Sequence, residues 1–201
     1  MCEKLGVNVW EVIDAAETKP SGFMKFTPGP GLGGHCIPID PFYLSWKMKT
    51  LDYDARFIKL AGEINTHMPI HVVDLISSTL NKQSKSINGS KILIIGVSYK
   101  KDIDDCRESP ALDIIEILDR SGSEISYYDP YVPSLSLNNL TLESLNILEI
   151  DVIKNFDACA IITNHSNIPY EVILNSKVPV IDTRNVFKNN SDKQIQRLGE
   201  G

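Results

Sequence analysis

Apolar residues in the first 80 positions recur three and four apart, which is the period of an amphipathic helix. This spacing predicts a helix over residues 1–17, which Asn8 can cap. A second helix is expected to begin at Asp40 and reach about Leu51, because aspartate is a favoured N-cap and Pro41 is a favoured first residue. The residues between these two helices are predicted to form a loop.

The longest apolar stripe predicts a third helix, capped by Asp54 and reaching about Leu80. The stripe consists of Phe57, Leu60, Ala61, Ile64, Met68, Leu75 and Ile76. Pro69 should kink this helix. A helix of about 27 residues spans about 40 Å. The stripe therefore fits either a helix that crosses a protein core or the core of a dimer.

Short strand-like runs alternate with helical patterns in the second half of the chain, after a polar linker over residues 81–89. Strands are predicted over residues 91–97, 124–128, 157–163 and 178–182, and helices from Pro110 to about Leu118 and from Pro169 to Leu174. This alternation indicates an α/β fold with a parallel sheet covered on both faces. Residues 134–156 are ambiguous and are expected to form a loop plus a short helix, and the polar tail from Lys188 is expected to fray.

The chain of 201 residues is 42% hydrophobic and 23% charged, which is typical of a soluble globular protein. Its net charge of −6 argues against nucleic acid or an anionic membrane as the main partner. Neither a long apolar run nor a signal-peptide pattern occurs, so no membrane span is expected. The four cysteines form no disulfide-like framework, which fits reduced thiols in a cytoplasm.

Four glycines and four prolines crowd into residues 28–42, so turns are expected there rather than a long helix. Cys36 lies in the middle of this glycine–proline segment, and Asp40 follows four residues later. Cys36 is a candidate nucleophile if its surroundings deprotonate it. A buried structural thiol is the alternative, and Asp40 could serve only as a helix cap. His35 adds too few ligands for a metal site, so no metal is predicted.

The first predicted strand of the second half leads into Gly96-Val97-Ser98-Tyr99-Lys100-Lys101-Asp102. The dinucleotide fingerprint G-x-G-x-x-G is missing at this turn. Ligands of parallel sheets bind beyond the carboxyl ends of the strands, where Tyr99 could stack on a base or ribose and Lys100 could neutralise a phosphate. The pattern indicates a nucleotide site without a nicotinamide signature. Alternatively, the two lysines are ordinary solvated surface charges.

The string Gly-Gly-His-Cys-Ile-Pro-Ile-Asp-Pro-Phe-Tyr-Leu around Cys36 resembles the active-site segment of the UDP-glucose/GDP-mannose dehydrogenase family. Within the family it is most similar to the branch that acts on UDP-N-acetylhexosamines. The resemblance continues in Tyr-Lys-Lys-Asp from Tyr99, in Arg-Glu-Ser-Pro from Arg107, and in Asp-Thr-Arg-Asn from Asp182. It covers essentially the whole chain, which corresponds to the C-terminal half of a family member.

The resemblance implies a role for each matching residue. Cys36 is the implied nucleophile, and Asp40 orients or activates groups around the thiol or the hydrolytic water. Arg107 is implied to reach the NAD cofactor. The residues implied to contact the UDP-sugar are Phe23, Met24, Lys25, Leu32, Gly33, Tyr99, Lys100 and Arg184. Some relatives carry the last arginine one position later, where this chain has Asn185.

The implied reaction is two successive NAD-dependent oxidations of the sugar C6 hydroxymethyl group, through a thiohemiacetal and a thioester on Cys36, in polysaccharide biosynthesis. The implied fold is the helical tail of a central dimerisation domain (residues 1–85), followed by a Rossmann-like UDP-sugar-binding domain (residues 86–201). We expect a homodimeric, cytoplasmic protein, and we expect these 201 residues alone to be inactive. A non-catalytic UDP-sugar-binding or dimerisation module remains the alternative. Which UDP-sugar binds stays open.

Overall fold

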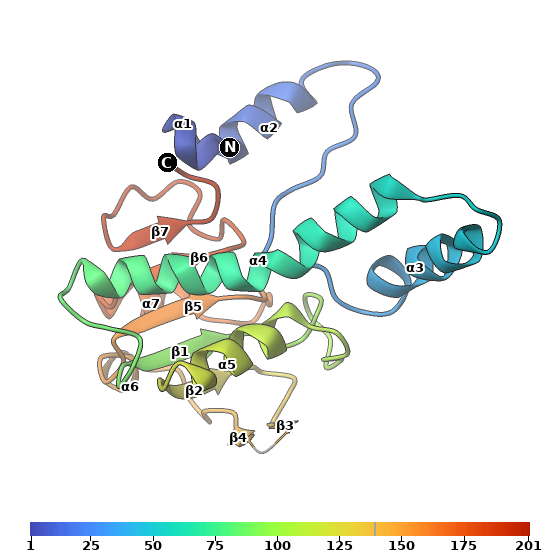
Figure 1. The fold of residues 1–201 in the computed structure, drawn as a ribbon. Coiled ribbons are helices and arrows are strands. Elements are labelled where there is room, and N and C mark those ends of the chain that lie inside the picture. The colour runs from blue at the N-terminus through green and yellow to red at the C-terminus, as the bar shows by residue number, and fades with distance from the viewer. Residues whose placement is uncertain (139) are drawn as a thin grey trace.

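The computed structural model describes residues 1–138 and 140–201, with a five-stranded parallel sheet at its centre (Figure 1). The strand order is β2-β1-β5-β6-β7. The strands are β1 (Lys91–Ile95), β2 (Glu124–Tyr128), β5 (Ala158–Ile161), β6 (Val180–Asp182) and β7 (Ile195–Arg197). The first four lie where the sequence predicts strands, and the parallel α/β fold is confirmed.

Helices cover both faces of this sheet, as the alternation of side chains along β1 requires. Ile92 and Ile94 pack in a core with α4 (Arg56–Asn81) and α5 (Pro110–Arg120). Leu93 and Ile95 point the other way, into a second core that contains the short helices α6 (Ile150–Ile153) and α7 (Tyr170–Asn175). Each of these four strand residues is fully buried, so β1 is the centre of both cores.

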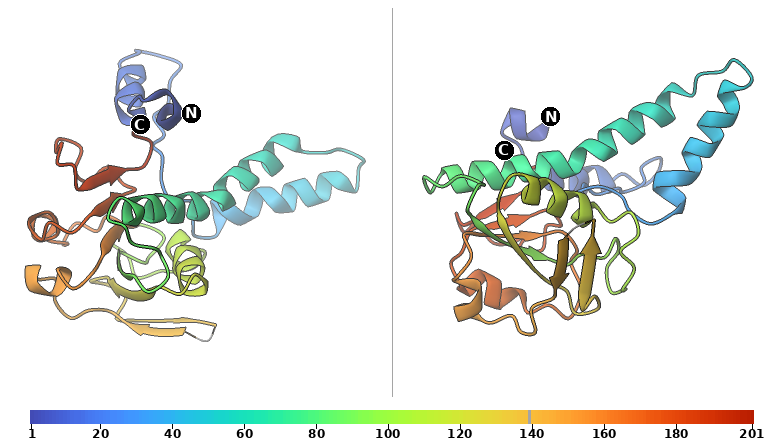
Figure 2. Two further views of the ribbon diagram at one scale, coloured as in Figure 1. Left: turned by 60° about the vertical axis from the view of Figure 1, so that its left-hand side comes forward. Right: turned by 60° about the horizontal axis from the view of Figure 1, so that its bottom comes forward.

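Helix α4 connects the sheet to the segment that carries Cys36. Its C-terminal half lies in the first core, where Val72, Ile76 and Leu80 are fully buried. Its N-terminal half extends past the sheet and packs against α3 (Cys36–Lys49). We call α3 and the residues of α4 before Pro69 the arm, because together they project from the body of the molecule (Figure 2).

Pro69 lies inside α4 without ending it, and the axis of the helix changes direction near its middle (Figure 2). This agrees with the predicted kink, because a proline removes one backbone hydrogen bond of the helix. The predicted cap is wrong. Helix α4 begins at Arg56 without a side-chain cap, and Asp54 instead accepts a hydrogen bond from Lys59.

The N-terminal segment forms two helices, α1 (Cys2–Leu5) and α2 (Val9–Glu17), where the sequence predicts one. Gly6 adopts a left-handed conformation with a φ of 67°, which ends α1. Asn8 caps α2 as predicted, because its side chain accepts a hydrogen bond from the backbone N–H of Trp10 at 2.9 Å. Apolar periodicity runs through this break and does not reveal it.

The polar tail does not fray, which corrects the expectation for residues after Lys188. It supplies β7, which pairs in parallel with β6. Leu198 is 2% exposed and accepts a hydrogen bond from the indole N–H of Trp10 at 2.9 Å. The two ends of the chain therefore lie side by side (Figure 1). Short polar strands have no apolar period, so sequence patterns miss them.

The ambiguous residues 134–156 contain an antiparallel hairpin, β3 (Ser134–Leu137) and β4 (Leu140–Glu143), followed by α6. The short helix is as predicted, but the hairpin is not. Each of its strands has four residues, too few for a clear alternation. Within the described residues, no helix has both the length and the apolar character needed to cross a bilayer.

Candidate active site

Cys36, in the middle of the glycine–proline segment, is the first residue of α3. The helix starts earlier than predicted, so the sequence-based cap at Asp40 is wrong: His35 holds the cap position and Asp40 lies one turn inside the helix. Residues four apart share a helix face. Pro38 fits in the first turn, because the N–H groups of that turn have no acceptor within the helix.

Three chemically active side chains therefore meet on the first turn of α3. The Cys36 sulfur, a ring nitrogen of His35 and a carboxylate oxygen of Asp40 lie within 4.8 Å of one another. His35 Nδ1 is 3.6 Å from Asp40 Oδ1, and all three residues are exposed. A thiol beside an imidazole and a carboxylate is an arrangement suited to nucleophilic catalysis with assistance from a base.

Gly33 brings the glycine–proline segment into direct contact with the loop that follows β1. A Cβ atom at Gly33 would lie 2.5 Å from the Tyr99 Cβ and 2.5 Å from the backbone oxygen of Glu108. The next residue, Gly34, donates its N–H to the backbone oxygen of Arg107 at 2.9 Å. Any side chain at Gly33 would separate these segments, so the close approach requires glycine. The structure thus brings together two predicted site segments that are 66 residues apart in sequence.

Arg184 provides a third element of the site, from the carboxyl end of β6. Its Nε donates to the backbone oxygen of Ile162 at 2.7 Å. Its Nη1 lies close to Gly29 of the glycine–proline segment. A Cβ atom added at Gly29 would be 2.8 Å from this nitrogen. Burial lowers the pKa of Arg184, and no carboxylate pairs with it among the described residues. A partly buried guanidinium in this position is a candidate anion ligand.

The loop after β1 presents the remaining predicted cations. Lys100 is exposed and has no ion pair within the described part of the chain. Arg107, the predicted cofactor contact, forms an ion pair with Asp105, with Nη2 to Oδ2 at 2.6 Å and Nε to Oδ2 at 3.0 Å, and its cofactor role stays a prediction. Hydrogen bonds from Arg107 lower the pKa of Asp105. Tyr99 donates its N–H to the Asp105 carbonyl at 3.0 Å, which closes the loop.

The predicted substrate segment Phe23-Met24-Lys25 lies in the long connection between α2 and α3. Lys25 forms ion pairs with Asp14 at 2.8 Å and Glu17 at 2.5 Å, both on α2. Hydrogen bonds that Lys25 donates to these carboxylates raise its pKa. Phe23 and Met24 are exposed. No described contact joins this segment to Cys36, and its substrate role stays a prediction.

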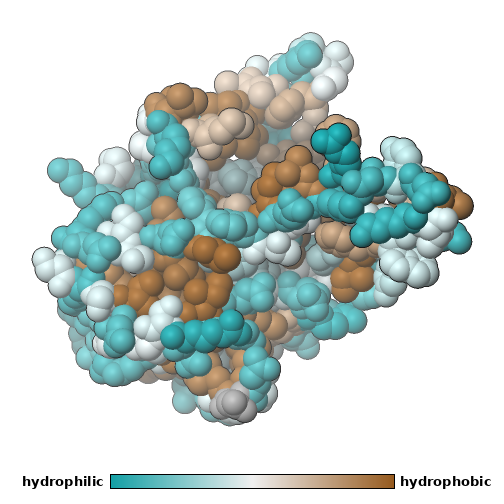
Figure 3. Space-filling view, viewed as in Figure 1, coloured by the Kyte–Doolittle hydropathy of each residue, from teal (hydrophilic) through white to brown (hydrophobic). Residues whose placement is uncertain are grey.

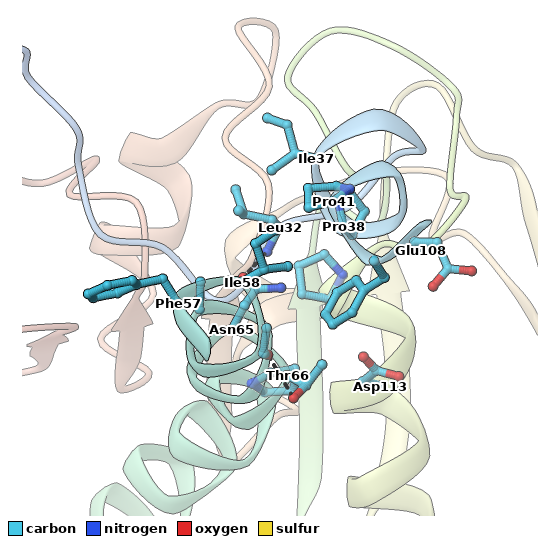
Figure 4. Close-up of a pocket in the computed structure, with 16 residues that line it drawn as sticks. Leu32, Ile37, Pro38, Pro41, Phe57, Ile58, Asn65, Thr66, Glu108 and Asp113 are labelled. Carbon is cyan, nitrogen blue, oxygen red and sulfur yellow. Dashed lines mark hydrogen bonds between the residues drawn. The ribbon is translucent and has the colours of Figure 1, made fainter. Parts of the chain in front are cut away.

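A cavity of about 480 Å³ lies between α3, α4 and the start of α5 (Figure 4). Leu32 lies at its rim and donates its N–H to Asn65 Oδ1 at 2.8 Å. Most of the wall is apolar, with carboxylates of Glu108 and Asp113 on one side. Burial raises the pKa of Asp113. Cys36 is not part of the wall, so the cavity lies beside the thiol site rather than around the thiol.

Two buried residues behind the Tyr99 loop were not predicted from the sequence. Asp129 ends β2 and His165 follows β5; they are 3% and 0% exposed. His165 Nε2 lies 3.0 Å from Asp129 Oδ2. Hydrogen bonds from His165 and from backbone N–H groups outweigh burial and lower the pKa of Asp129. A polar residue directly after a strand is a sequence signal that could have indicated Asp129, whereas His165 lies further beyond β5 and has no such signal.

The site lies at the point where the order of the sheet reverses. From β1 the chain passes to β2 on one side and then returns to β5 on the other. The carboxyl ends of β1 and β5 flank the crevice in which parallel sheets bind ligands. Tyr99 and Lys100 follow β1 at this edge, and Arg184 follows β6. The predicted nucleotide residues thus share one edge of the sheet with the thiol segment.

Comparison with known sequence families gives two matches, both to the UDP-glucose/GDP-mannose dehydrogenase family. The family's central domain matches residues 1–67, and its UDP binding domain matches residues 93–189. The first match contains Cys36, and the second contains the Tyr99 loop and Arg184. The two matched regions are therefore the ones that meet at the site.

Individual relatives belong to the same family of dehydrogenases as the matching family models. The UDP-N-acetyl-D-mannosamine dehydrogenase of Methanococcus maripaludis is 34% identical over all of this chain and 47% of its own length. The Escherichia coli protein of the same name is 32% identical over 94% of this chain and 45% of its own. The chain thus spans about half the length of the curated relatives it matches.

Solved structures show the same relationship. The UDP-D-ManNAc dehydrogenase of Pyrococcus horikoshii superposes with a TM-score of 0.84 at 33% identity, over 100% of this chain and 46% of that protein. An NDP-N-acetyl-D-galactosaminuronic acid dehydrogenase of Methanosarcina mazei gives 0.82 at 26% identity, over 99% and 45%. Sequence, fold and the placement of the matched segments lead to one conclusion: this chain belongs to the UDP-glucose/GDP-mannose dehydrogenase family.

Proposed function

We propose that this chain is the thiol-bearing and UDP-sugar-binding part of a UDP-N-acetylhexosamine 6-dehydrogenase. One observation carries the proposal: the Cys36 segment packs through Gly33 onto the Tyr99 loop, so the thiol and the nucleotide residues form one site. The names of the curated relatives favour UDP-N-acetyl-D-mannosamine as the substrate. The homodimer and the cytoplasmic location expected from the sequence belong to the same proposal.

In this proposal the cations hold the diphosphate and the thiol performs covalent chemistry on the sugar. Lys100 and Arg184 pair with phosphate oxygens, and Tyr99 stacks on the uridine. The Cys36 thiolate adds to the C6 aldehyde carbon to give a thiohemiacetal. Oxidation of that adduct gives a thioester, and water then attacks the thioester carbonyl and expels the thiolate. Asp40, on the same helix face, orients the water or receives its proton.

The oxidant implied by the family is NAD, which accepts the hydride in each oxidation. The turn after β1 does not fit a dinucleotide. Its backbone N–H groups, which a pyrophosphate would need, are already bonded to Asp129 Oδ2, from Val97 at 2.7 Å and from Ser98 at 3.4 Å. The turn also lacks the G-x-G-x-x-G fingerprint. We therefore assign to this chain the substrate and thiol chemistry, and no step of hydride transfer.

The test is calorimetric titration of the chain with UDP. Lys100→Ala and Arg184→Ala should each weaken UDP binding by about 1.5–3 kcal/mol, because each removes a charge-assisted contact to phosphate. Lys193→Ala is the matched control: Lys193 is exposed and precedes β7, which places it at the opposite edge of the parallel sheet. Unchanged UDP affinity in both site variants would refute the proposed nucleotide site.

A further inference from the structure

His165 holds the part of the loop that carries Tyr99 and Lys100, although it lies 63 positions beyond Asp102, which it contacts there. The backbone N–H of Asp102 donates to His165 Nδ1 at 2.9 Å. On its other side, His165 Nε2 lies 3.0 Å from Asp129 Oδ2 and 3.3 Å from Ser98 Oγ. The imidazole therefore bridges Ser98 and Asp102, which flank Tyr99 and Lys100, and Asp129 after β2.

These contacts assign one tautomer to the ring. A backbone N–H can only donate, so Nδ1 must accept and carries no proton. Nε2 then carries the proton and donates it to the Asp129 carboxylate. Asp129 also accepts the N–H of Val97 at 2.7 Å, and the ring of Tyr131 packs against His165 with centroids 5.0 Å apart. Every polar atom of the buried imidazole has a partner.

The residue after His165 completes the attachment. Ser166 donates its N–H to Asp102 Oδ1 at 2.7 Å and its hydroxyl to Asp102 Oδ2 at 2.8 Å. Asp102 thus gives a hydrogen bond to His165 and accepts two from Ser166. Its φ of 62° is in the left-handed region, where a residue other than glycine persists only if its neighbours hold it there.

We infer that His165 is a positioning residue for nucleotide binding: through Nδ1 it holds the Asp102 amide, and thereby sets the place of Lys100 and Tyr99. This inference rests on the proposed function, because it concerns the loop assigned to the UDP-sugar. The physical reason is entropic. A loop with free ends would lose conformational freedom when UDP binds, whereas a loop held in place beforehand loses little.

The chain offers a matched pair of variants at this position. The Asn side-chain oxygen overlays Nδ1, so His165→Asn keeps the acceptor for the Asp102 amide. The Gln amide overlays Nε2, so His165→Gln keeps the donor to Asp129 and loses that acceptor. We expect His165→Gln to weaken UDP binding about tenfold or more, and His165→Asn by no more than about threefold. Equal losses in the two variants would overturn the inference.

Two further measurements do not depend on the folding of a variant at a buried site. Long-range ¹⁵N NMR of the unaltered chain should show His165 as the Nε2–H tautomer, with the Asp102 amide protected from exchange; an Nδ1–H tautomer overturns the inference. Ser166→Ala removes one contact to Asp102 at an exposed position and should weaken UDP binding about threefold. Unchanged affinity in this variant also counts against it.

Cys159→Ala serves as the stability control. Cys159 is fully buried in β5 and belongs to the opposite core, away from the loop. If Cys159→Ala weakens UDP binding as much as His165→Gln, the effect is global destabilisation and the positioning role is wrong. The Lys100→Ala titration separates the two proposals. If Lys100→Ala weakens UDP binding but His165→Asn and His165→Gln have equal UDP affinities, only the positioning role fails. If neither Lys100→Ala nor Arg184→Ala changes UDP affinity, the proposed function fails.

Discussion

Arg184 occupies an unusual position for a charged side chain. Its guanidinium lies against the backbone of Gly29, partly buried and without a carboxylate partner in the described chain. Burying an unpaired charge costs free energy, and the lowered pKa of Arg184 expresses this cost. A bound phosphate or carboxylate would offset it. The residue is therefore suited to bind an anion rather than to stabilise the fold.

This position leads to a prediction at Gly29. A methyl group there would lie 2.8 Å from Arg184 Nη1, the mobile end of a long side chain. Gly29→Ala should therefore move the guanidinium with little loss of stability, and weaken UDP binding about tenfold, as loss of a well-aligned charge-assisted hydrogen bond does. Calorimetry measures the affinity, and thermal unfolding measures the stability.

A double-mutant cycle provides the control for Gly29. In an Arg184→Ala background, Gly29→Ala should have no further effect on UDP affinity, because no guanidinium remains to be displaced. Additive losses would mean that the methyl group acts through the backbone of the glycine–proline segment and not through Arg184.

Several large apolar side chains of the arm are exposed to solvent. Along α4, the side chains of Phe57, Leu60 and Ile64 are 89%, 52% and 59% exposed. On α3, Leu44 and Trp46 are 56% and 68% exposed. Figure 3 shows apolar side chains at the surface around these projecting helices. A stripe this long favours a dimer core over a helix that simply crosses the core of one chain.

The prediction for this element is that Ile64→Asp splits a homodimer. A carboxylate in an apolar seam would lose its hydration without gaining a partner, which is costly. Light scattering at micromolar concentration should give the dimer mass for the unaltered chain and the monomer mass for the variant. Glu63→Lys, which changes a charge at the adjacent exposed position off the stripe, should leave the mass unchanged. A monomeric unaltered chain contradicts the prediction.

At the scale of the whole molecule, we propose that the chain carries the thiol chemistry and the UDP binding, but not the binding of the dinucleotide. It contains the thiol segment and the residues that we propose bind UDP, while Asp129 accepts the backbone N–H of Val97 in the turn after β1. We expect this polypeptide alone not to reduce NAD with any UDP-sugar, because hydride transfer needs the nicotinamide positioned against C6.

The measurement is NADH absorbance with UDP-ManNAc, UDP-GlcNAc and UDP-glucose. It is made first with the chain alone and then with the N-terminal half of a family member added in trans. Activity that appears only on addition, and that Cys36→Ser abolishes, supports the catalytic proposal. Turnover by the chain alone contradicts it. UDP binding without activity under any condition favours the non-catalytic module.

Sequence alone determined the parts of this protein that depend on local chemistry. Apolar runs were sufficient for four of the five strands of the parallel sheet, because burial on both faces selects β-branched and aliphatic residues along each strand. Cap chemistry identified Asn8, whose side chain accepts a hydrogen bond from the N–H of Trp10. The family followed from four short strings of residues.

Tertiary structure decided what depends on distant partners. Asp40 has the local features of a cap, yet α3 begins at Cys36, and the carboxylate lies one turn inside the helix beside the thiol. β7 exists only because β6 offers it an edge. His165 has no sequence signature, since its role comes from the N–H of Asp102 and the carboxylate of Asp129, which the fold alone brings to it. Hydrogen bonds between residues far apart in sequence leave no periodic trace, so only the folded chain reveals them.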